Sequence, residues 1–575
     1  MTKIKHTGVR DVRGADLRRY FIMAGKKRRR KRSPIPIILL LAAAVLIAYA
    51  VVKVYPSLSE SAADADLQSY FGISDGEAAI VVNDEIIDAK GILQDDTIYL
   101  DYDTVREYLN DRFLWDESSG QMLLTLPSGT ESWKDGDGTL LVKDGTPYIS
   151  ASCVKENSDI DMDIFSDPDR VVARTKWDNI PTEVLTEDSD VRLTDGKKGE
   201  ILTHVKKGDT VVLTQNADNW CCVATNDGFI GYVKKDVLKS GDELTHTSDP
   251  RFSFEKISVD GPICMGWQYT EQDSGLSAFG DLTNNTGVNI ISPTWFTVND
   301  NKGTVSSLAA KDYVDQAHNS GIMVWGCFQD VYDNDGISAA SYLQTESVRQ
   351  HIIDQLIQAA SDTGMDGINL DIETITEEAT PYYLQFIREL CEAAHKKNLV
   401  VSVDNYTSTY TQYLNRKEQA ETADYLVIMG YDEHTTSSGE AGSVASISFV
   451  EQGITDLLNE GVDASRVING IPFYSRGWTQ NAGEDSPTCE VLAMGDQKAW
   501  ADSHGITVSW DANLCQNTGK ATVNDTTYSI WEEDAQSIES KMQLVEKYQL
   551  AGVAAWRLGL ETADVWNIIN QYLKN

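Results

Sequence analysis

The 575-residue sequence lacks the patterns that bind metals and nucleotides. Its eight cysteines form no C-x-x-C pair, no cysteine–histidine cluster has zinc spacing, and no segment resembles a phosphate-binding loop. Positive charge is also scarce, because 49 Lys and Arg face 88 Asp and Glu, which leaves a net charge of −39. A surface of that sign repels a phosphate backbone, so nucleic acid is excluded as the default partner. We therefore expect no metal, no organic cofactor and no nucleic acid.

The positive charge that does exist is concentrated at the N-terminus. Residues 1–33 carry 13 Lys or Arg against two acidic residues and include seven consecutive basic residues. The apolar run Ile35–Val52 follows, and its 18 residues are just enough to cross a bilayer as a helix. Because the positive flank stays inside, we expect a cytoplasmic tail (1–33), a transmembrane helix (34–55) and an extracellular remainder at the cell membrane. The alternative is secretion after signal cleavage, since Ala48-Tyr49-Ala50 has the small-x-small cleavage pattern.

Three segments of different texture come next. Residues 56–77 are rich in Ser, Ala and Asp and predict a stalk. Residues 78–175 combine short strand-like runs with one helical pattern (102–113), which predicts an α+β module. Residues 185–240 contain five short β runs separated by turns rich in Gly, Asp and Lys, which is typical of a small closed all-β barrel.

Both modules resemble known exported domains. The segments VVNDEII, TIYLDYDTVREYL and FLWDESSGQMLLTL are similar to the copper amine oxidase N-terminal-like module of Gram-positive bacteria. That resemblance implies a spacer or adhesion role and no copper ligands. Trp220 and the strand Gly231-Tyr232-Val233 resemble the bacterial Src-homology-3-like domain, which implies contact with cell-wall peptides. A plain spacer barrel is the alternative for that second module.

From residue 253 to 575, buried strand patterns alternate with helical ones such as 348–363 and 382–396, and this alternation predicts a (β/α)8 TIM barrel. The eight strand-like runs are 263–267, 290–296, 322–328, 367–372, 399–403, 425–429, 467–472 and 552–555. Residues 479–535 are too long for one loop and contain strand-like pieces, so we expect a small α+β insertion between strands seven and eight. Cys489 and Cys515 lie in it, either as a disulfide or as free thiols.

The fourth of these strands carries the candidate catalytic residues. Along Met365–Glu373 apolar residues alternate with Asn369, Asp371 and Glu373, which therefore share the inner face and climb toward the C-terminal end. In such barrels the active site forms at that end. Two adjacent buried carboxyls cannot both ionise easily, so one pKa rises, as a general acid requires. The alternative, a strand that runs out into solvent, disagrees with Gly367 and the apolar partners.

These nine residues match the signature of glycoside hydrolase family 18, D-G-x-[DN]-x-[DN]-x-E after an apolar residue, and the resemblance spans roughly 255–575. It implies a retaining mechanism in which the 2-acetamido oxygen of the substrate attacks its own anomeric carbon, an exception to the two-carboxylate rule. Glu373 is then the acid and base. Asp371 stabilises the oxazolinium cation, and Tyr431 orients the acetamido carbonyl.

The same resemblance implies contacts with the sugar from six further residues: Asn369, Asp432, Trp556, Tyr474, Arg476 and Trp295. His434 is either near the sugar or structural. Asn369 stands where many chitinases carry Asp; it can hydrogen-bond Asp371 but cannot share a negative charge. In this respect the sequence is similar to the spore-cortex and cell-wall N-acetylglucosaminidase branch of the family.

The expected substrate therefore contains β-1,4-linked N-acetylglucosamine. Peptidoglycan is the first hypothesis, because the chain is expected to be tethered outside the membrane beside a wall-binding module. Chitin or chitooligosaccharide is the alternative with the same chemistry. A wall-binding lectin is the alternative from another class, although Glu373 with Asp371 argues against it, since lectin-like members usually lose the acid.

Overall fold

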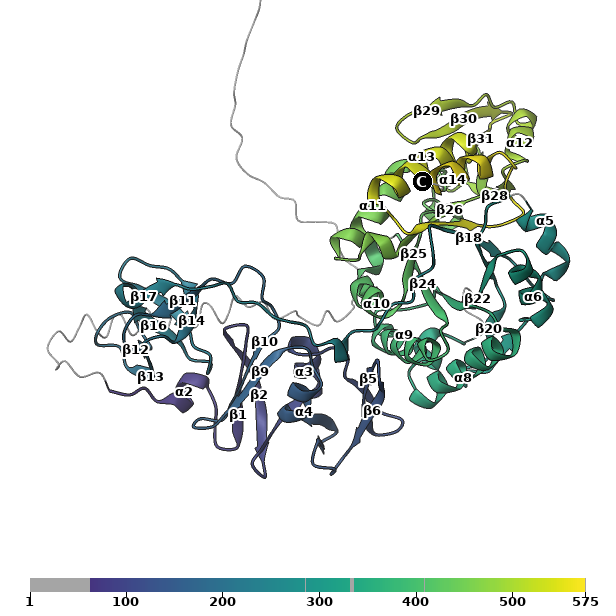
Figure 1. The fold of residues 1–575 in the computed structure, drawn as a ribbon. Coiled ribbons are helices and arrows are strands. Elements are labelled where there is room, and N and C mark those ends of the chain that lie inside the picture. Colours follow the sequence, from purple (N-terminus) through teal and green to yellow (C-terminus); the bar gives the residue numbers. More distant parts are fainter. Residues whose placement is uncertain (1–62, 285, 331–335, 408, 574–575) are drawn as a thin grey trace, which may run out of the picture.

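The computed structural model describes residues 63–575, apart from residues 285, 331–335, 408 and 574–575 (Figure 1). The predicted basic tail and the apolar run Ile35–Val52 lie outside the described residues. Within the described part, none of the helices combines the length and apolarity needed to cross a bilayer. Two small β-rich modules, purple to blue in Figure 1, lie to one side of a larger helix-surrounded barrel, teal to yellow.

Eight parallel strands close the barrel in the order β19-β18-β32-β26-β25-β24-β23-β22, and β19 pairs back with β22. The strands are β18 (Ile263–Gln268), β19 (Ile290–Pro293), β22 (Met323–Asp330), β23 (Gly367–Ile372), β24 (Val400–Tyr406), β25 (Tyr425–Met429), β26 (Val467–Pro472) and β32 (Gly552–Trp556). All eight predicted strands are present, so the predicted TIM barrel is confirmed. A short hairpin, β20 (Phe296–Val298) and β21 (Val305–Ser307), extends the sheet beside β22.

Helices cover the outside of the barrel (Figure 1). They are α5 (Phe279–Thr283), α6 (Lys311–Asn319), α7 (Ala339–Tyr342), α8 (Glu346–Thr363), α9 (Thr380–His395), α10 (Arg416–Thr422), α11 (Ile447–Asn459), α13 (Ala535–Tyr548) and α14 (Val565–Leu573). The sequence sets where α8 stops, because Gly364 adopts the left-handed conformation (φ 82°) that ends a helix. The chain then enters β23, where Ile368 and Leu370 are fully buried in the main core. This turn fixes the register that points Asn369 and Asp371 into the barrel.

The insertion between β26 and β32 is an antiparallel sheet in the order β28-β27-β31-β30-β29. Its elements are β27 (Tyr474–Asn481), β28 (Thr488–Ala493), α12 (Gln497–Ser503), β29 (Ser509–Asp511), β30 (Gln516–Val523) and β31 (Thr526–Glu532). The insertion thus begins earlier than the predicted residue 479, and Tyr474 and Arg476 belong to its first strand. Cys489 and Cys515 are free thiols.

The first small module is a mixed sheet in the order β7-β8-β3-β2-β1-β10-β9 with two helices, beside a three-stranded sheet β4-β5-β6. Its elements are β1 (Glu77–Val82), β2 (Glu85–Gln94), β3 (Thr97–Asp101), α3 (Tyr102–Tyr108), β4 (Leu114–Asp116), β5 (Gln121–Leu126), β6 (Gly129–Lys134), β7 (Leu140–Lys143), β8 (Thr146–Ser150), α4 (Ala151–Glu156), β9 (Asp161–Phe165) and β10 (Arg170–Arg174). The helix α3 is shorter than the predicted 102–113. The likeness of this module to the amine oxidase-like domain stays a prediction.

The second small module is a seven-stranded sheet in the order β13-β12-β16-β15-β14-β11-β17. Its strands are β11 (Thr182–Leu185), β12 (Ser189–Arg192), β13 (Ile201–Val205), β14 (Thr210–Gln215), β15 (Trp220–Ala224), β16 (Ile230–Lys234) and β17 (Leu238–Ser240). The strands β11 and β17 extend the sheet beyond the five predicted runs, at the edge next to β14. The Src-homology-3-like identity and the wall-peptide contact stay predictions.

Part of the predicted stalk is folded. The helix α2 (Leu67–Phe71) lies within it, and Phe71, 1% exposed, packs in the core of the second module against Phe229. The Tyr70 hydroxyl donates to the Ile230 carbonyl at 2.9 Å. The stalk prediction is therefore wrong for these residues, because their aromatic side chains have a core to enter.

Candidate active site

The strand β23 delivers three polar side chains toward the mouth of the barrel, as its alternating sequence predicts. Asn369 and Asp371 are buried on the strand, and Glu373, directly after its last residue, is partly exposed. Glu373 thus has access to a substrate, while the two residues beneath it are enclosed. This arrangement agrees with a catalytic acid at the barrel mouth whose neighbours deeper in the barrel are held in place by burial.

The Asn369 side chain is fully buried and hydrogen-bonded on both of its polar atoms. Its Oδ1 accepts from Trp267 Nε1 (2.9 Å) and Ser292 Oγ (3.1 Å), and its Nδ2 donates to Ser402 Oγ (3.0 Å) and Asp404 Oδ1 (2.8 Å). The expected hydrogen bond to Asp371 is replaced by one to Asp404. A side chain without exposed surface cannot touch a sugar, so the predicted role of Asn369 as a sugar contact is wrong. It orients its neighbours instead.

The carboxyls of Asp371 and Glu373 are electrostatically unusual. Burial raises the pKa of Asp371 well above its ordinary value, and the nearby charges of Glu373 and Asp330 raise it further. Burial also raises the pKa of Glu373; a hydrogen bond from Tyr406 acts in the opposite direction, and the charges of Asp432 and Asp330 add to the rise. Glu373 therefore keeps its proton to higher pH than a free glutamate, which suits a general acid.

Tyr406 is a site residue that the sequence analysis missed. It ends β24, and its hydroxyl donates a hydrogen bond to Glu373 Oε2. The predicted strand stopped at residue 403, before the polar residues Asp404 and Tyr406. The signal was present nonetheless, because Ser402, Asp404 and Tyr406 repeat with the period of a strand.

Tyr431 and Asp432 follow β25 and face the insertion. The buried Tyr431 ring makes edge contacts with Trp267 and Tyr474, at centroid distances of 6.5 and 6.4 Å. Asp432 adopts the left-handed conformation (φ 60°) and accepts hydrogen bonds from the Tyr474 hydroxyl (2.5 Å) and Arg476 Nη2 (2.6 Å). The structure thus brings four predicted site residues together, with Tyr474 and Arg476 holding Asp432.

Trp556 ends β32 and is partly exposed, so its ring can form the predicted apolar floor. It packs edge-on against the buried Trp267 at 5.8 Å. Trp267, which the sequence analysis did not single out, therefore joins Trp556, Tyr431 and Asn369 into one cluster. At the rim, Tyr269 is 37% exposed and lies beneath the Arg557 guanidinium, 4.9 Å from its carbon to the ring centroid.

Two other expectations are corrected or resolved. Trp295 is 1% exposed, donates through Nε1 to the Ser274 carbonyl (3.0 Å) and packs on Tyr313, so its predicted sugar contact is wrong. His434 Nδ1 lies 3.0 Å from the Ser443 carbonyl, and the backbone N–H of His434 bonds the same carbonyl. Of the two interpretations left open for His434, the structural one applies.

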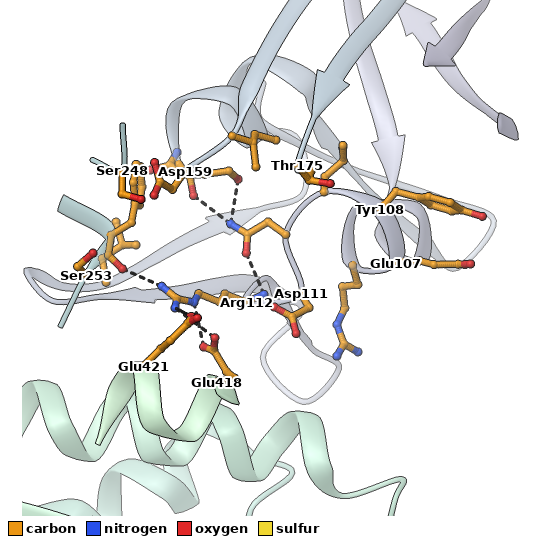
Figure 2. A pocket seen from close by; sticks show the side chains of 18 residues that line it. Glu107, Tyr108, Asp111, Arg112, Asp159, Thr175, Ser248, Ser253, Glu418 and Glu421 are labelled. Atoms are coloured by element: carbon orange, nitrogen blue, oxygen red, sulfur yellow. Dashed lines mark hydrogen bonds and ion pairs between the residues drawn. The ribbon is translucent and has the colours of Figure 1, made fainter. Parts of the chain in front are cut away.

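A cavity of about 60 Å³ lies beside Glu373 and is lined in part by Tyr383, Asp404, Tyr406 and Met429. It has room for an ordered water next to the acid. A larger cavity, about 710 Å³, lies between the first small module and α10 (Figure 2). None of the predicted site residues lines that larger cavity, so its size does not make it the active site.

Comparison with known proteins agrees with this location. Residues 335–561, which include β23 and the last four barrel strands, match the family model Glycosyl hydrolases family 18. The Uncharacterized glycosylase YvbX of Bacillus subtilis is 26% identical over 325 residues, 53% of this chain and 90% of that protein. The Cortical fragment-lytic enzyme of Bacillus subtilis is 24% identical over 40% of this chain and 54% of its own, so the match spans about half of that relative. The crystal structure of the Bacillus cereus spore cortex-lytic enzyme SleL superposes with a TM-score of 0.48 at 16% identity, over 58% of this chain and 78% of that one.

Proposed function

We propose that this chain, which carries a glycoside hydrolase family 18 domain and is a glycosidase, cleaves β-1,4-linked N-acetylglucosamine in peptidoglycan at the outer face of the cell membrane. The observation that carries the proposal is the position of Glu373 at the end of β23, above the enclosed Asp371 and beside Tyr431. A partly exposed acid with a raised pKa is what the departure of a glycosidic oxygen requires.

The chemistry follows from these groups. Glu373 protonates the leaving oxygen while the acetamido oxygen of the same sugar attacks the anomeric carbon, forming a cyclic oxazolinium ion. Asp371 accepts a hydrogen bond from the acetamido N–H and stabilises the positive charge. The Tyr431 hydroxyl donates a hydrogen bond to the acetamido oxygen. Glu373 then removes a proton from water, which opens the ring with overall retention.

The electrostatics of the site favour this cationic intermediate. Asp330 and Asp432 lie beside the catalytic pair, and among their described partners Arg476 bonds Asp432 at the rim. Fixed negative charge in a water-poor site stabilises a developing positive charge without reorganisation. The same field is unfavourable for an anionic substrate close to the reacting bond.

Peptidoglycan is favoured over chitin by two considerations. One relative is named for lysis of cortical fragments, and the predicted basic tail and apolar run would place the barrel outside the membrane. The wall-peptide contact expected of the second small module belongs to the same proposal. Against them stands the acidic surface of the chain, which is repelled by anionic wall polymers.

The test is digestion of purified peptidoglycan and, separately, chitooligosaccharide by residues 55–575, with mass spectrometry of the new reducing ends. We expect new N-acetylglucosamine ends from peptidoglycan. Glu373→Gln should lower the rate by about 10²–10⁴-fold, since it removes the general acid while keeping the shape of the side chain. Cleavage of chitooligosaccharide alone would keep the mechanism and change the substrate. If the protein binds the wall but cleaves neither substrate, the enzyme proposal is wrong and the lectin alternative takes its place.

A further inference from the structure

Among the residues that the structure describes, two carboxyl oxygens in the barrel interior find no hydrogen-bond partner: Asp371 Oδ1 and Asp404 Oδ2. Both residues are 5% exposed. They lie on adjacent parallel strands whose last paired residues are Leu370 and Val403, so Asp371 and Asp404 are the next two residues along the two strands. Side chains at matching positions of paired strands point to the same face.

Two neighbouring buried carboxylates without a cation beside them raise the free energy of the folded protein. In such a pair one carboxyl usually keeps its proton. None of the described titratable groups that face Asp404 is a cation that could neutralise the pair. Asp371 belongs to β23 and Glu373 follows it. Tyr383 comes from α9, Cys327 from β22, and Tyr431 follows β25. All are acids. Burial, followed by the charge of Asp371, raises the pKa of Asp404.

The hydrogen bond from Asn369 indicates which oxygen of Asp404 holds that proton. Its Nδ2 donates to Asp404 Oδ1 at 2.8 Å, so Oδ1 must be an acceptor. The proton is left for Oδ2, the atom without a partner, which can then donate to the unpartnered Oδ1 of Asp371.

We propose that Asp404 is a positioning residue for the hydrolysis, holding the proton of an Asp371–Asp404 pair so that Asp371 meets the acetamido group as a carboxylate. This inference rests on the proposed function for its catalytic meaning. It also explains the departure at position 369. An amide there, with the second carboxyl on the next strand, provides one proton-holding partner for Asp371; Asp at both positions would put a third acid in the same enclosed space.

The test uses the full chain and two readouts. The first is the infrared band of protonated carboxyls at pH 7 in the Glu373→Gln background, which removes the other acid of the site. We expect the difference between this protein and its Asp404→Asn derivative to show the loss of one protonated carboxyl. The double change Asn369→Asp with Asp404→Asn moves the carboxyl back to β23 and should restore the band. Asp116→Asn, a buried and fully hydrogen-bonded carboxyl elsewhere, is the matched control and should leave the band unchanged.

The second readout is the pH dependence of kcat/KM on a fluorogenic di-N-acetylchitobioside, with Glu373 intact. Asp404→Asn replaces the proton-holding carboxyl by an amide, which is a weaker hydrogen-bond donor to Asp371. The acidic limb, which reports protonation of Asp371, should therefore move to higher pH, and the double change, which returns an acid to its side, should move it back. A merely structural Asp404 would change stability and leave the limb in place.

The outcomes separate the two proposals. One outcome is that Asp404→Asn lowers the infrared band of protonated carboxyls while the protein cleaves none of the N-acetyl sugars. That result overturns the proposed function and supports the proton-sharing Asp371–Asp404 pair. An active enzyme whose band and acidic limb ignore Asp404→Asn overturns the pair and keeps the function. Should Asp404→Asn fail to fold, Asp371→Asn gives the same infrared comparison, because the amide introduced at position 371 would donate to Asp404 and ionise it.

Discussion

At the scale of single residues, the behaviour of Glu373 depends on what touches its carboxyl. Burial and the charges of Asp432 and Asp330 raise its pKa, and the Tyr406 hydroxyl is the hydrogen bond that opposes them. The tyrosine stabilises the ionised form, so it helps the residue act as a base in the second step and weakens its hold on the proton in the first.

Tyr406→Phe should therefore raise the pKa of Glu373 further and move the basic limb of the kcat/KM profile to higher pH. The limb reports loss of the acid's proton, and that proton is held more tightly once the hydroxyl is gone. The measurement is a pH profile on a soluble chitooligosaccharide. Tyr413→Phe is the matched control, because Tyr413 lines the same cavity but donates to the Ile375 carbonyl. A basic limb that stays put, or that moves equally in both variants, contradicts the assignment.

The sequence predicts the catalytic strand well and its neighbours poorly, for physical reasons. Asn369, Asp371 and Glu373 alternate with apolar residues, and period two alone places them on one face. Asp404 was missed because the apolar run of its strand ends at Val403, while β24 continues to Tyr406. Trp295 was assigned to the sugar because a motif gives its position in the chain but not whether its ring turns outward or into the core.

At the scale of elements, α8 depends on a different module for its N-terminus. Within the described part of the chain, the side chain of its N-cap residue, Thr345, makes no capping hydrogen bond. The amide of Glu346 instead donates to Oδ2 of Asp116 (2.8 Å), the last residue of β4. A carboxylate at a helix N-terminus satisfies a free N–H and interacts favourably with the helix dipole.

Asp116→Ala should cost about 1–2 kcal/mol in the free energy of unfolding, measured with urea. Glu117→Ala, one residue along and exposed, should have little effect. Burial raises the pKa of Asp116, but hydrogen bonds from Ser118 and the Glu346 amide outweigh it, so the pKa lies below its ordinary value. The stabilisation is therefore present at neutral pH and is lost as pH falls through the carboxyl's titration below about 4. Equal losses for both variants, or a loss that grows in acid, would contradict this account.

The helix α9 shows the limit of sequence analysis at this scale. Its apolar pattern predicts one buried face, yet polar residues of its other face are buried as well, because β4, β5 and β6 cover them. Gln385 donates to Thr125 Oγ1 (2.7 Å) and to Glu389, which pairs with Arg349 inside the interface. The contact joins residues 260 positions apart, so no local pattern reveals it.

At the scale of the whole molecule, ion pairs join the first small module to helix α10 of the barrel. Arg112 donates from Nε and Nη2 to the two carboxylate oxygens of Glu418 (2.9 and 3.1 Å) and from Nη2 to Glu421 (3.3 Å). Figure 2 shows this guanidinium above α10. Arg388 of the barrel shares Glu418, whose pKa is lowered because the two cations outweigh its burial.

Arg112→Ala should lower the free energy of unfolding by about 3 kcal/mol, because a nearly buried carboxylate loses one of two cations. Arg106→Ala is the control, since Arg106 lines the same cavity and, among the described residues, makes no ion pair to the barrel. Urea unfolding followed by tryptophan fluorescence measures both. Similar stabilities for the two variants would mean that apolar packing, not this ion pair, joins the module to the barrel.

The two small modules are themselves fused through a shared core. Ala79 and Val81 of β1 pack with residues of the second sheet, and Gly228 approaches Val172 so closely that a Cβ would lie 2.6 Å from it. Arg170 bridges the same boundary to Asp227. The sequence analysis predicted the separate modules but not the packing at either joint, because contacts between segments so far apart in the chain leave no local pattern.

This packing sets a geometry for the work of the enzyme. The described chain begins at α2, at the end of the modules away from the barrel in Figure 1, and every joint between that point and Glu373 is packed. The packed modules therefore act as a spacer that holds the catalytic mouth at one distance from α2. Under the membrane attachment proposed above, this spacing would set how far from α2 a glycan strand can lie and still be cut.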